Sequence, residues 1–161
     1  MEVFESLKAN LGGKNARIVL PEGEEPRILQ AAKRIVNETE VTPILLGNPD
    51  KISIYLEIEG ILEGYEVIDP KAYPQFEEMV ASLVERRKGK MTEEEARQIL
   101  QDDVNYFGVM LVHMGIVDGM VSGAIHSTAA TVRPALQIIK TRPNVKRTSG
   151  AFLMVRGTER Y

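Results

Sequence analysis

One stretch near the amino terminus decides the fold: ARIVLPEGEEPRILQAAKRIVNETEVTPILLGNPD, residues 16–50. Its first part, ARIVLPE, is a short apolar run that ends at a proline, which is typical of a buried strand. The middle part, EEPRILQAAKRIVNE, places its apolar residues on one helical face and has Pro26 in position for the first turn. VTPILLGNPD then predicts a second strand that ends in a turn. The stretch therefore predicts a strand, a helix and a strand in succession.

The same alternation continues along the chain. Thr92 is followed three residues later by Glu95, a capping box that predicts a helix start. The other expected elements are helices over 3–11, 51–59, 74–88, 92–100, 105–119 and 131–141, and strands over 65–69, 119–123 and 150–157. Continuous apolar strands that alternate with helices favour a parallel sheet covered by helices on both faces. The predicted fold class is α/β.

The last predicted strand bears on the length of the protein. AFLMV, residues 151–155, has the composition of an interior strand, yet only RGTERY follows it. A parallel strand left in that position would expose apolar surface and unpaired edge groups. We therefore expect these 161 residues to be the leading part of a longer protein.

Composition and charge exclude several classes of function. With 161 residues, 43% of them hydrophobic and 27% charged, the chain is typical of one globular domain. A net charge of −3 disfavours binding to nucleic acid or to an anionic membrane, so any anion has to be bound locally. The chain has no cysteine, so no disulfide is expected, and its two isolated histidines do not have the spacing of a metal site. No membrane span or signal peptide is recognisable, so we expect a cytoplasmic protein.

The segment VSGAIHSTAATVRPALQIIK, residues 121–140, concentrates hydroxyl groups and one arginine behind a predicted strand. Ligands of α/β sheets bind beyond the carboxyl ends of strands, in loops that lead into helices. Ser127, Thr128 and Thr131 would supply hydroxyl groups there, beside backbone amides left free at the helix start. Arg133 would add a bidentate pair to a phosphate. The segment therefore favours a phosphate-binding site.

A structural interpretation of the same segment stays open. We place Arg133 and Pro134 in the first turn of the helix, where proline loses no hydrogen bond. In the alternative, Ser127 or Thr128 only caps this helix and Arg133 pairs with a surface carboxylate. The segment matches neither the Walker A pattern nor G-x-G-x-x-G.

Other polar features have structural interpretations. His126 adjoins Ser127, but sequence neighbours usually point apart and no third member of a triad is in view, so we expect no catalytic pair. His113 is interpreted as a core or helix-end histidine. The basic run ERRKGK, residues 85–90, ends a helix, where the dipole favours cations. The acidic turn LPEGEEPR, residues 20–27, is interpreted as a solvated turn, and without a fixed geometry the sequence assigns no acid–base role to Glu22, Glu24 or Glu25.

Four segments together resemble a known family. They are VLPEGEEPRILQAA, ERRKGKMTEEEA, NYFGVMLVHMGIVDGMVSGAIHSTAATVRPALQIIKT and GAFLMVRGTERY. In order and spacing they resemble the phosphate acetyltransferases, a family shared with the phosphate butyryltransferases. The resemblance covers essentially the whole chain but about the first half of a typical member.

The resemblance implies an architecture and an activity. The architecture is a pair of α/β domains like those of isocitrate and isopropylmalate dehydrogenases, with the active site in the cleft between them. Residues 1–148 would belong to the first domain and residues 149–161 would begin the second. The activity is reversible transfer of an acetyl group between coenzyme A and inorganic phosphate, giving acetyl phosphate, in a homodimer. Coenzyme A would be a substrate, and no tightly bound cofactor or metal is implied.

The resemblance also implies roles for individual residues. Arg133 would be catalytic and would neutralise the charge of the phosphate. Arg86, or its neighbour Arg87, would hold the phosphate groups of coenzyme A. Substrate would also contact the hydroxyl groups of Ser127, Thr128 and Thr131. The catalytic aspartate and a serine–arginine pair of the family belong to the second half, so we expect this chain alone to bind anions and to catalyse poorly. The alternatives are a phosphate butyryltransferase and a non-catalytic domain that senses acyl-coenzyme A.

Overall fold

The strand–helix–strand unit predicted for residues 16–50 is confirmed in the computed structural model of the chain. β1 spans Arg17–Leu20, α2 spans Pro26–Glu38 and β2 spans Thr42–Leu46. Pro26 stands at the start of α2, as its missing N–H predicts. β1 and β2 run parallel, with Arg17 opposite Thr42.

The described part of the chain falls into two units. The structure describes residues 15–61 and 63–145, Ser6 and Ala9, and the backbone of residues 155–156 and 159–160. Residues 15–140 form one unit, and residues 1–14 group with residues 141–161 in the other.

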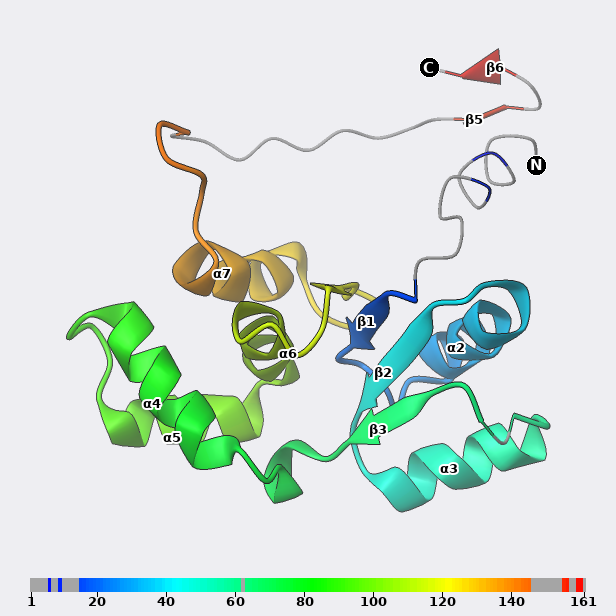
Figure 1. The fold of residues 1–161 in the computed structure, drawn as a ribbon, viewed down its shortest axis with the longest axis horizontal. Coiled ribbons are helices and arrows are strands. Elements are labelled where there is room, and N and C mark those ends of the chain that lie inside the picture. Colours follow the sequence, from blue (N-terminus) through cyan, green and yellow to red (C-terminus); the bar gives the residue numbers. More distant parts are fainter. Residues whose placement is uncertain are drawn as a thin grey trace. The chain divides into compact units, whose positions relative to one another are not determined.

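Four parallel strands form the sheet of residues 15–140. Their order is β3-β2-β1-β4, with β3 at Glu66–Ile68 and β4 at Gly119–Met120. β2 and β3 lie on one side of β1 and β4 lies on the other, so the direction of winding reverses at β1 (Figure 1). Ligands of such sheets bind at this reversal, beyond the carboxyl ends of the strands. The loops after β1 and β4 are therefore the expected place for a site.

The remaining helices overlap the segments predicted to be helical, including 51–59. They are α3 (Pro49–Ile58), α4 (Phe76–Arg87), α5 (Glu93–Asp102), α6 (Val104–His113) and α7 (Thr128–Ile138), with a 3-10 turn at Pro70–Ala72. α6 ends at His113, where the sequence predicted a helix as far as residue 119. The predicted capping box of α5 is present: Glu95 donates its amide to Thr92 Oγ1, and Thr92 donates its amide to Glu95 Oε2. Within the described residues, no helix combines the length and apolarity needed to cross a bilayer.

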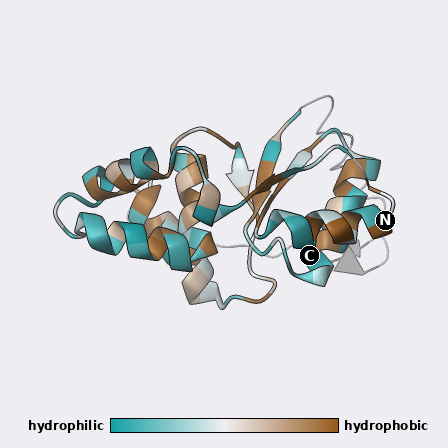
Figure 2. Cartoon of the chain, turned by 90° about the horizontal axis from the view of Figure 1, so that it is seen from below, coloured by the Kyte–Doolittle hydropathy of each residue, from teal (hydrophilic) through white to brown (hydrophobic). Residues whose placement is uncertain are grey.

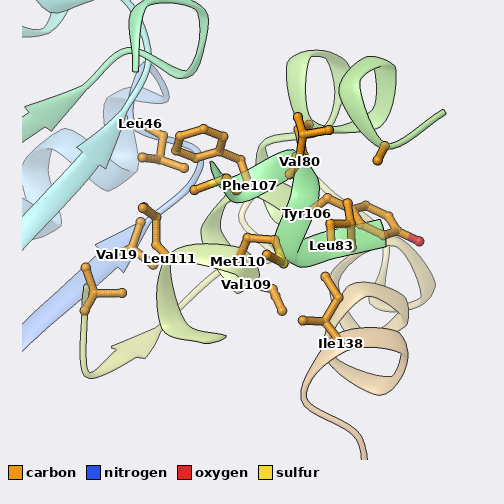
Figure 3. Close-up of a cluster of buried hydrophobic side chains, with 14 of the residues drawn as sticks. Val19, Leu46, Val80, Leu83, Tyr106, Phe107, Val109, Met110, Leu111 and Ile138 are labelled. Atoms are coloured by element: carbon orange, nitrogen blue, oxygen red, sulfur yellow. The ribbon is translucent and has the colours of Figure 1, made fainter. Parts of the chain in front are cut away.

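Helices cover both faces of the sheet, as predicted. On one face Val19, Ile44 and Leu46 pack with side chains of α4, α5, α6 and α7, the cluster that Figure 3 shows. Leu20 and Leu45 point to the opposite face and pack with α2 and α3. This division follows from the sequence because successive side chains of a strand alternate between faces. Figure 2 shows hydrophobic residues in the strands and mostly hydrophilic residues on the outer sides of the helices.

α7 begins earlier than predicted. Ser127 Oγ accepts a hydrogen bond from the amide of Ala130 at 3.3 Å, so that Ser127 caps a helix whose first residue is Thr128. Pro134 therefore lies inside α7 and not in its first turn, and the prediction was wrong on this point. A proline there has no N–H for the carbonyl oxygen of Ala130. Arg133 accordingly extends from the second turn of α7.

In the second unit, β5 (Val155–Arg156) pairs antiparallel with β6 (Glu159–Arg160). We expected a parallel strand over residues 150–157, and its described residues instead pair with the segment that immediately follows them. Two strands joined by so short a connection can only run antiparallel. Of the helix expected over residues 3–11, the structure describes only Ser6 and Ala9.

Candidate functional site

A cavity of about 290 Å³ lies where the sheet predicts a ligand site, at the carboxyl ends of β1 and β2. The residues that line it come from the loop after β1, the end of β2, the start of α6 and the loop after β4. They are residues 21–25, Leu46, Gly47, Val104, Ile125 and His126. Carboxylates, aliphatic side chains and one imidazole therefore meet in this cavity.

Glu22 binds the loop after β4 through four backbone amides. Its Oε2 accepts hydrogen bonds from the amides of Gly123 at 3.1 Å and Ala124 at 2.7 Å. Its Oε1 accepts from the amides of Ile125 at 2.9 Å and His126 at 3.0 Å. Glu22 is only 4% exposed, so these bonds replace water almost completely. The protein's own carboxylate thus occupies the amides of the loop before α7, within the segment that the sequence predicted to bind phosphate.

The carboxylate of Glu22 stays ionised throughout the neutral range. Burial on its own would raise the pKa of Glu22, but hydrogen bonds from the Ile125 amide, the His126 side chain and the Ala124 amide outweigh it and lower this pKa to about 2. The interpretation of residues 20–27 as solvated surface was therefore wrong for Glu22. Sequence reasoning missed this residue because its partners lie far away in the chain.

His126 is paired with Glu22 and not with Ser127. Its Nδ1 lies 2.7 Å from Glu22 Oε1, and its side chain is 30% exposed and lines the cavity. Ser127 Oγ instead caps α7, a contact that both interpretations of this residue allow. His126 does not pair with Ser127, as expected. It pairs instead with the carboxylate of Glu22, which the sequence did not indicate.

The start of α7 keeps two backbone donors open. Thr131 Oγ1 donates to the carbonyl oxygen of Ser127 at 3.1 Å, so this hydroxyl is used to fasten the helix start. The amides of Thr128 and Ala129 have no acceptor among the described residues. Thr128 is exposed, and its hydroxyl lies beside these amides in sequence. The first turn of α7 therefore still offers donors to an anion, one turn after the loop that Glu22 fills.

A buried amide secures the strand end that leads into this loop. Asn105 is fully buried, and its Oδ1 accepts a hydrogen bond from Ser122 Oγ at 2.6 Å. Its Nδ2 has no partner among the described residues. Asp103 Oδ1 accepts from the Asn105 amide at 2.8 Å and so fixes the start of α6 beneath the loop.

The structure separates the two neighbouring arginines of α4. The Nε of Arg86 donates to the carbonyl oxygen of Ile138, and its Nη2 donates to that of Ile139 at 3.0 Å, so that Arg86 satisfies the carboxyl end of α7. The Nε of Arg87 is buried and has no partner among the described residues. The sequence favoured Arg86 as the substrate ligand, but this guanidinium is already bound within the fold.

Arg87 and Arg133 act on the same phenol. Burial raises the pKa of Tyr106 and the charge of Asp103 adds to that rise, while the positive charges of Arg87 and Arg133 oppose it. The Tyr106 hydroxyl donates to Gln137 Oε1 at 2.8 Å, which ties α6 to α7. Arg133 is exposed and forms no ion pair with any described residue, so the surface pair of the structural alternative is not found among them. The charges of two arginines that have no carboxylate partner among the described residues therefore reach Tyr106.

A second positive region surrounds the end of α4. It includes a cavity of about 230 Å³ lined by Ser82, Glu85, Arg86, Lys88 and His113. Burial lowers the pKa of Lys140 here, and the charges of Arg86, Lys88, Arg87 and Lys90 lower it further. His113 ends α6, as interpreted from the sequence. No group of three potential metal ligands occurs among the described residues.

Known proteins resemble the chain over nearly its whole length. A family model described as "Phosphate acetyl/butaryl transferase" matches residues 2–161. The phosphate acetyltransferase of Bacillus subtilis strain 168 is 49% identical in an alignment that covers 99% of this chain and 50% of that protein. The phosphate acetyltransferase of Staphylococcus aureus strain Mu50 is 52% identical over 99% of this chain and 49% of its own length.

Solved structures agree with these relatives. A phosphotransacetylase from Streptococcus pyogenes superposes with a TM-score of 0.92 at 52% identity, covering 99% of this chain and 49% of the other. The EutD phosphotransacetylase from Staphylococcus aureus gives 0.87 at 51% identity, with 99% and 48% covered. The chain thus spans about half the length of the curated relatives it matches. A family match from residue 2 to residue 161 shows that the chain belongs to the phosphate acetyl/butaryl transferase family.

Proposed function

We propose that the protein to which this chain belongs transfers an acetyl group reversibly between coenzyme A and inorganic phosphate. The family and the names of the relatives support this activity. The structural observation that supports it best is the pair of arginines whose charges reach Tyr106. Arg87 and Arg133 both act on its phenol, and neither has a carboxylate partner among the described residues. Such a pair is suited to substrates that bring phosphate groups of their own.

Acetyl phosphate would bind at the start of α7. The amides of Thr128 and Ala129 and the hydroxyl of Thr128 would donate to its phosphoryl oxygens, with Arg133 neutralising their charge. Ser127 Oγ accepts the Ala130 amide and keeps its own hydrogen for an anion. Thr131 would contribute by holding the helix start through its bond to Ser127.

Coenzyme A would bind beside α4. Arg87, whose buried Nε has no partner among the described residues, is the better candidate for its phosphate groups than Arg86, which ends α7. Lys88 and Lys140 would add positive potential near the same helix end and so attract an anionic substrate. Coenzyme A acts here as a substrate, and the proposal includes no tightly bound cofactor.

The reaction would be a direct attack of the coenzyme A thiolate on the acetyl carbonyl, in a complex that holds both substrates. Orienting two substrates in one site supplies several kcal/mol of the catalytic effect. A thiol is mostly protonated at neutral pH, so that its attack needs a base. The family resemblance assigns this base, an aspartate, to the second half of the protein. Residues 1–161 alone are therefore expected to bind anions and to show little turnover.

We propose acetyl, and not butyryl, as the transferred group because the relatives named above are phosphate acetyltransferases. A butyryltransferase is the alternative within the family, and a domain that only senses acyl-coenzyme A is the alternative outside catalysis. We further infer a cytoplasmic homodimer from the family resemblance. An assay of phosphate-dependent consumption of acetyl-coenzyme A separates the enzyme from a sensor, and butyryl-coenzyme A as substrate tests the acyl preference.

Arg133→Gln tests the site. In a protein that joins this chain to a second half, we expect kcat/KM to fall about 100-fold or more, because a charge-assisted contact to phosphate is lost. Arg34→Gln is the matched control, since Arg34 is an exposed arginine of α2 that pairs with Glu38. Unchanged kinetics in Arg133→Gln would remove this residue from the site and contradict the proposal.

A further inference from the structure

The Glu22–His126 pair provides a group that the proposed reaction needs and that the arginines do not supply. When thiolate attacks dianionic acetyl phosphate, the leaving group is trianionic phosphate unless a proton reaches the departing oxygen. Trianionic phosphate is a strong base and a poor leaving group in water. Arginine never gives up its proton in proteins, so Arg133 can neutralise charge there but cannot act as an acid.

The geometry fixes the state of the imidazole. Glu22 is ionised, so it has no hydrogen to donate, and the hydrogen between the two groups belongs to His126 Nδ1 at 2.7 Å. In the neutral ring Nε2 then carries a lone pair, and this is the ring nitrogen that Glu22 leaves available. The His126 ring lines the cavity at the carboxyl ends of the strands. A cation formed on this ring would lie against an ionised carboxylate, the arrangement that makes a histidine an effective acid and base.

The neighbouring charges are already paired. Glu24 accepts from the Asn48 amide at 2.9 Å and from Lys51 Nζ at 3.1 Å. Glu25 pairs with Arg27, whose Nη2 also donates to the carbonyl oxygen of Ala124 at 2.8 Å. Besides Glu22, these are the charged groups that line the cavity or touch the loop within the described residues. Glu22 is thus the carboxylate that determines the state of His126.

We propose that His126 Nε2 exchanges a proton with a phosphate oxygen during acyl transfer, and that Glu22 is the positioning residue that orients the ring for this. The inference rests on the proposed function. His126 lies two residues before α7, whose first two amides, those of Thr128 and Ala129, are open, and this favours the phosphate over the thiol as its partner. The class of ligand is a phosphate or acyl phosphate, with one oxygen that gains or loses a proton.

The step balances as follows in the direction that makes acetyl phosphate. A phosphate oxygen attacks the acetyl carbon of acetyl-coenzyme A. The phosphate O–H bond breaks and its proton moves to His126 Nε2, while the new C–O bond forms. The C–S bond breaks, and its electron pair leaves on sulfur. The imidazolium releases its proton to solvent. The thiolate takes a proton from the protonated form of the base proposed for the second half, which solvent then protonates again. In the reverse direction the imidazolium gives its proton to the departing phosphate oxygen.

The test uses nitrogen NMR of the imidazoles in the 161-residue chain, which has two histidines. His113→Gln removes the other imidazole and is the matched control that assigns the signals. At alkaline pH we expect His126 Nδ1 in the protonated state and Nε2 in the unprotonated state. Addition of inorganic phosphate should shift the amides of Thr128 and Ala129 and move Nε2 toward the protonated state. Sulfate carries no proton at this pH and should shift the amides with little effect on Nε2.

Each outcome decides the question. A hydrogen on Nε2 in place of Nδ1, or equal Nε2 shifts with sulfate and phosphate, would overturn the proposal. If phosphate shifts the amides in an Arg133-dependent way but leaves Nε2 unchanged, the phosphate site stands and the role of His126 does not. If phosphate shifts neither the amides nor Nε2, both the phosphate site and this inference fail. Glu22→Gln should give a mixture of the two tautomers if it folds; if it does not fold, the tautomer of the unsubstituted chain decides.

Discussion

Two regions of the unit formed by residues 15–140 differ in whether their charged groups find partners within the protein. In the loop after β4, the carboxylate of Glu22 satisfies four backbone amides from within the protein. Around Tyr106, Arg87 and Arg133 have no carboxylate partner among the described residues. A loop rich in donors is therefore not by itself a binding site, because the fold can supply the anion. The cations that the fold leaves without a partner are the better guide to where a ligand binds.

The largest effect on stability is expected from Glu22→Gln, which tests the internally satisfied region. A neutral amide would present a donor to amides that need acceptors, in a site closed to water. We expect the free energy of unfolding to fall by about 3 kcal/mol or more in urea titrations. Glu24→Gln is the control, because Glu24 also accepts a backbone amide but is 42% exposed. Equal losses in both variants would contradict the special role of Glu22.

The pH dependence of stability tests the same region without a substitution. The pKa of Glu22 is lowered on folding from 4.5 to about 2, so its contribution is complete above about pH 4.5 and is lost as the pH falls toward 2. The shift corresponds to about 3 kcal/mol. Urea titrations over this range should show a steep loss of stability with acid, and Glu22→Gln should flatten it. An unchanged slope in the variant would assign the loss to other carboxylates.

A smaller effect should separate the two arginines of α4. Arg86→Gln removes two hydrogen bonds to the carboxyl end of α7, and we expect it to lower the free energy of unfolding by about 1–2 kcal/mol. Arg87→Gln should change stability little, because it removes a buried Nε that has no partner among the described residues. Urea titrations of both variants measure the difference. A larger loss of stability in Arg87→Gln than in Arg86→Gln would show that Arg87, and not Arg86, has the structural role.

The smallest effect is expected from the threonines of α7. Thr131→Val keeps the shape of the side chain and removes its bond to the Ser127 carbonyl, at a cost of about 0.5–1 kcal/mol. Phosphate affinity, measured by calorimetry, should stay the same. Thr128→Val should do the reverse, with weaker phosphate binding and little change in stability. If Thr131→Val weakens phosphate binding more than Thr128→Val, the assignment of these hydroxyl groups is wrong.

The strands and helices could be predicted from the sequence because their signals are local. The apolar run before Pro21 marks β1, and the periodic apolar face after Pro26 marks α2. Thr92 and Glu95 marked the start of α5 in the same way. The start of α7 was misplaced because a cap at Ser127 and the proline at Pro134 are both plausible helix starts, and the sequence does not tell which one is used.

The candidate site depends on contacts that no local pattern reports. The hydrogen bonds of Glu22 join residues that are 101 to 104 positions apart. The difference between Arg86 and Arg87 depends on where α7 ends relative to α4, which sequence periodicity does not determine. A glutamate two residues after the first strand was the signal available for Glu22, since the loop after a strand of a parallel sheet lies where ligands bind.

The long separation between Glu22 and its amide partners has a consequence for how the protein folds. A contact between residues that far apart closes nearly the whole unit into one loop, and contacts of this kind slow folding because their entropy has to be lost first. We expect the loop after β4 to become ordered only once the strands have paired and α6 has docked. During synthesis on the ribosome, the pocket would then take shape after its surrounding scaffold, so that a nascent chain gains ligand affinity late.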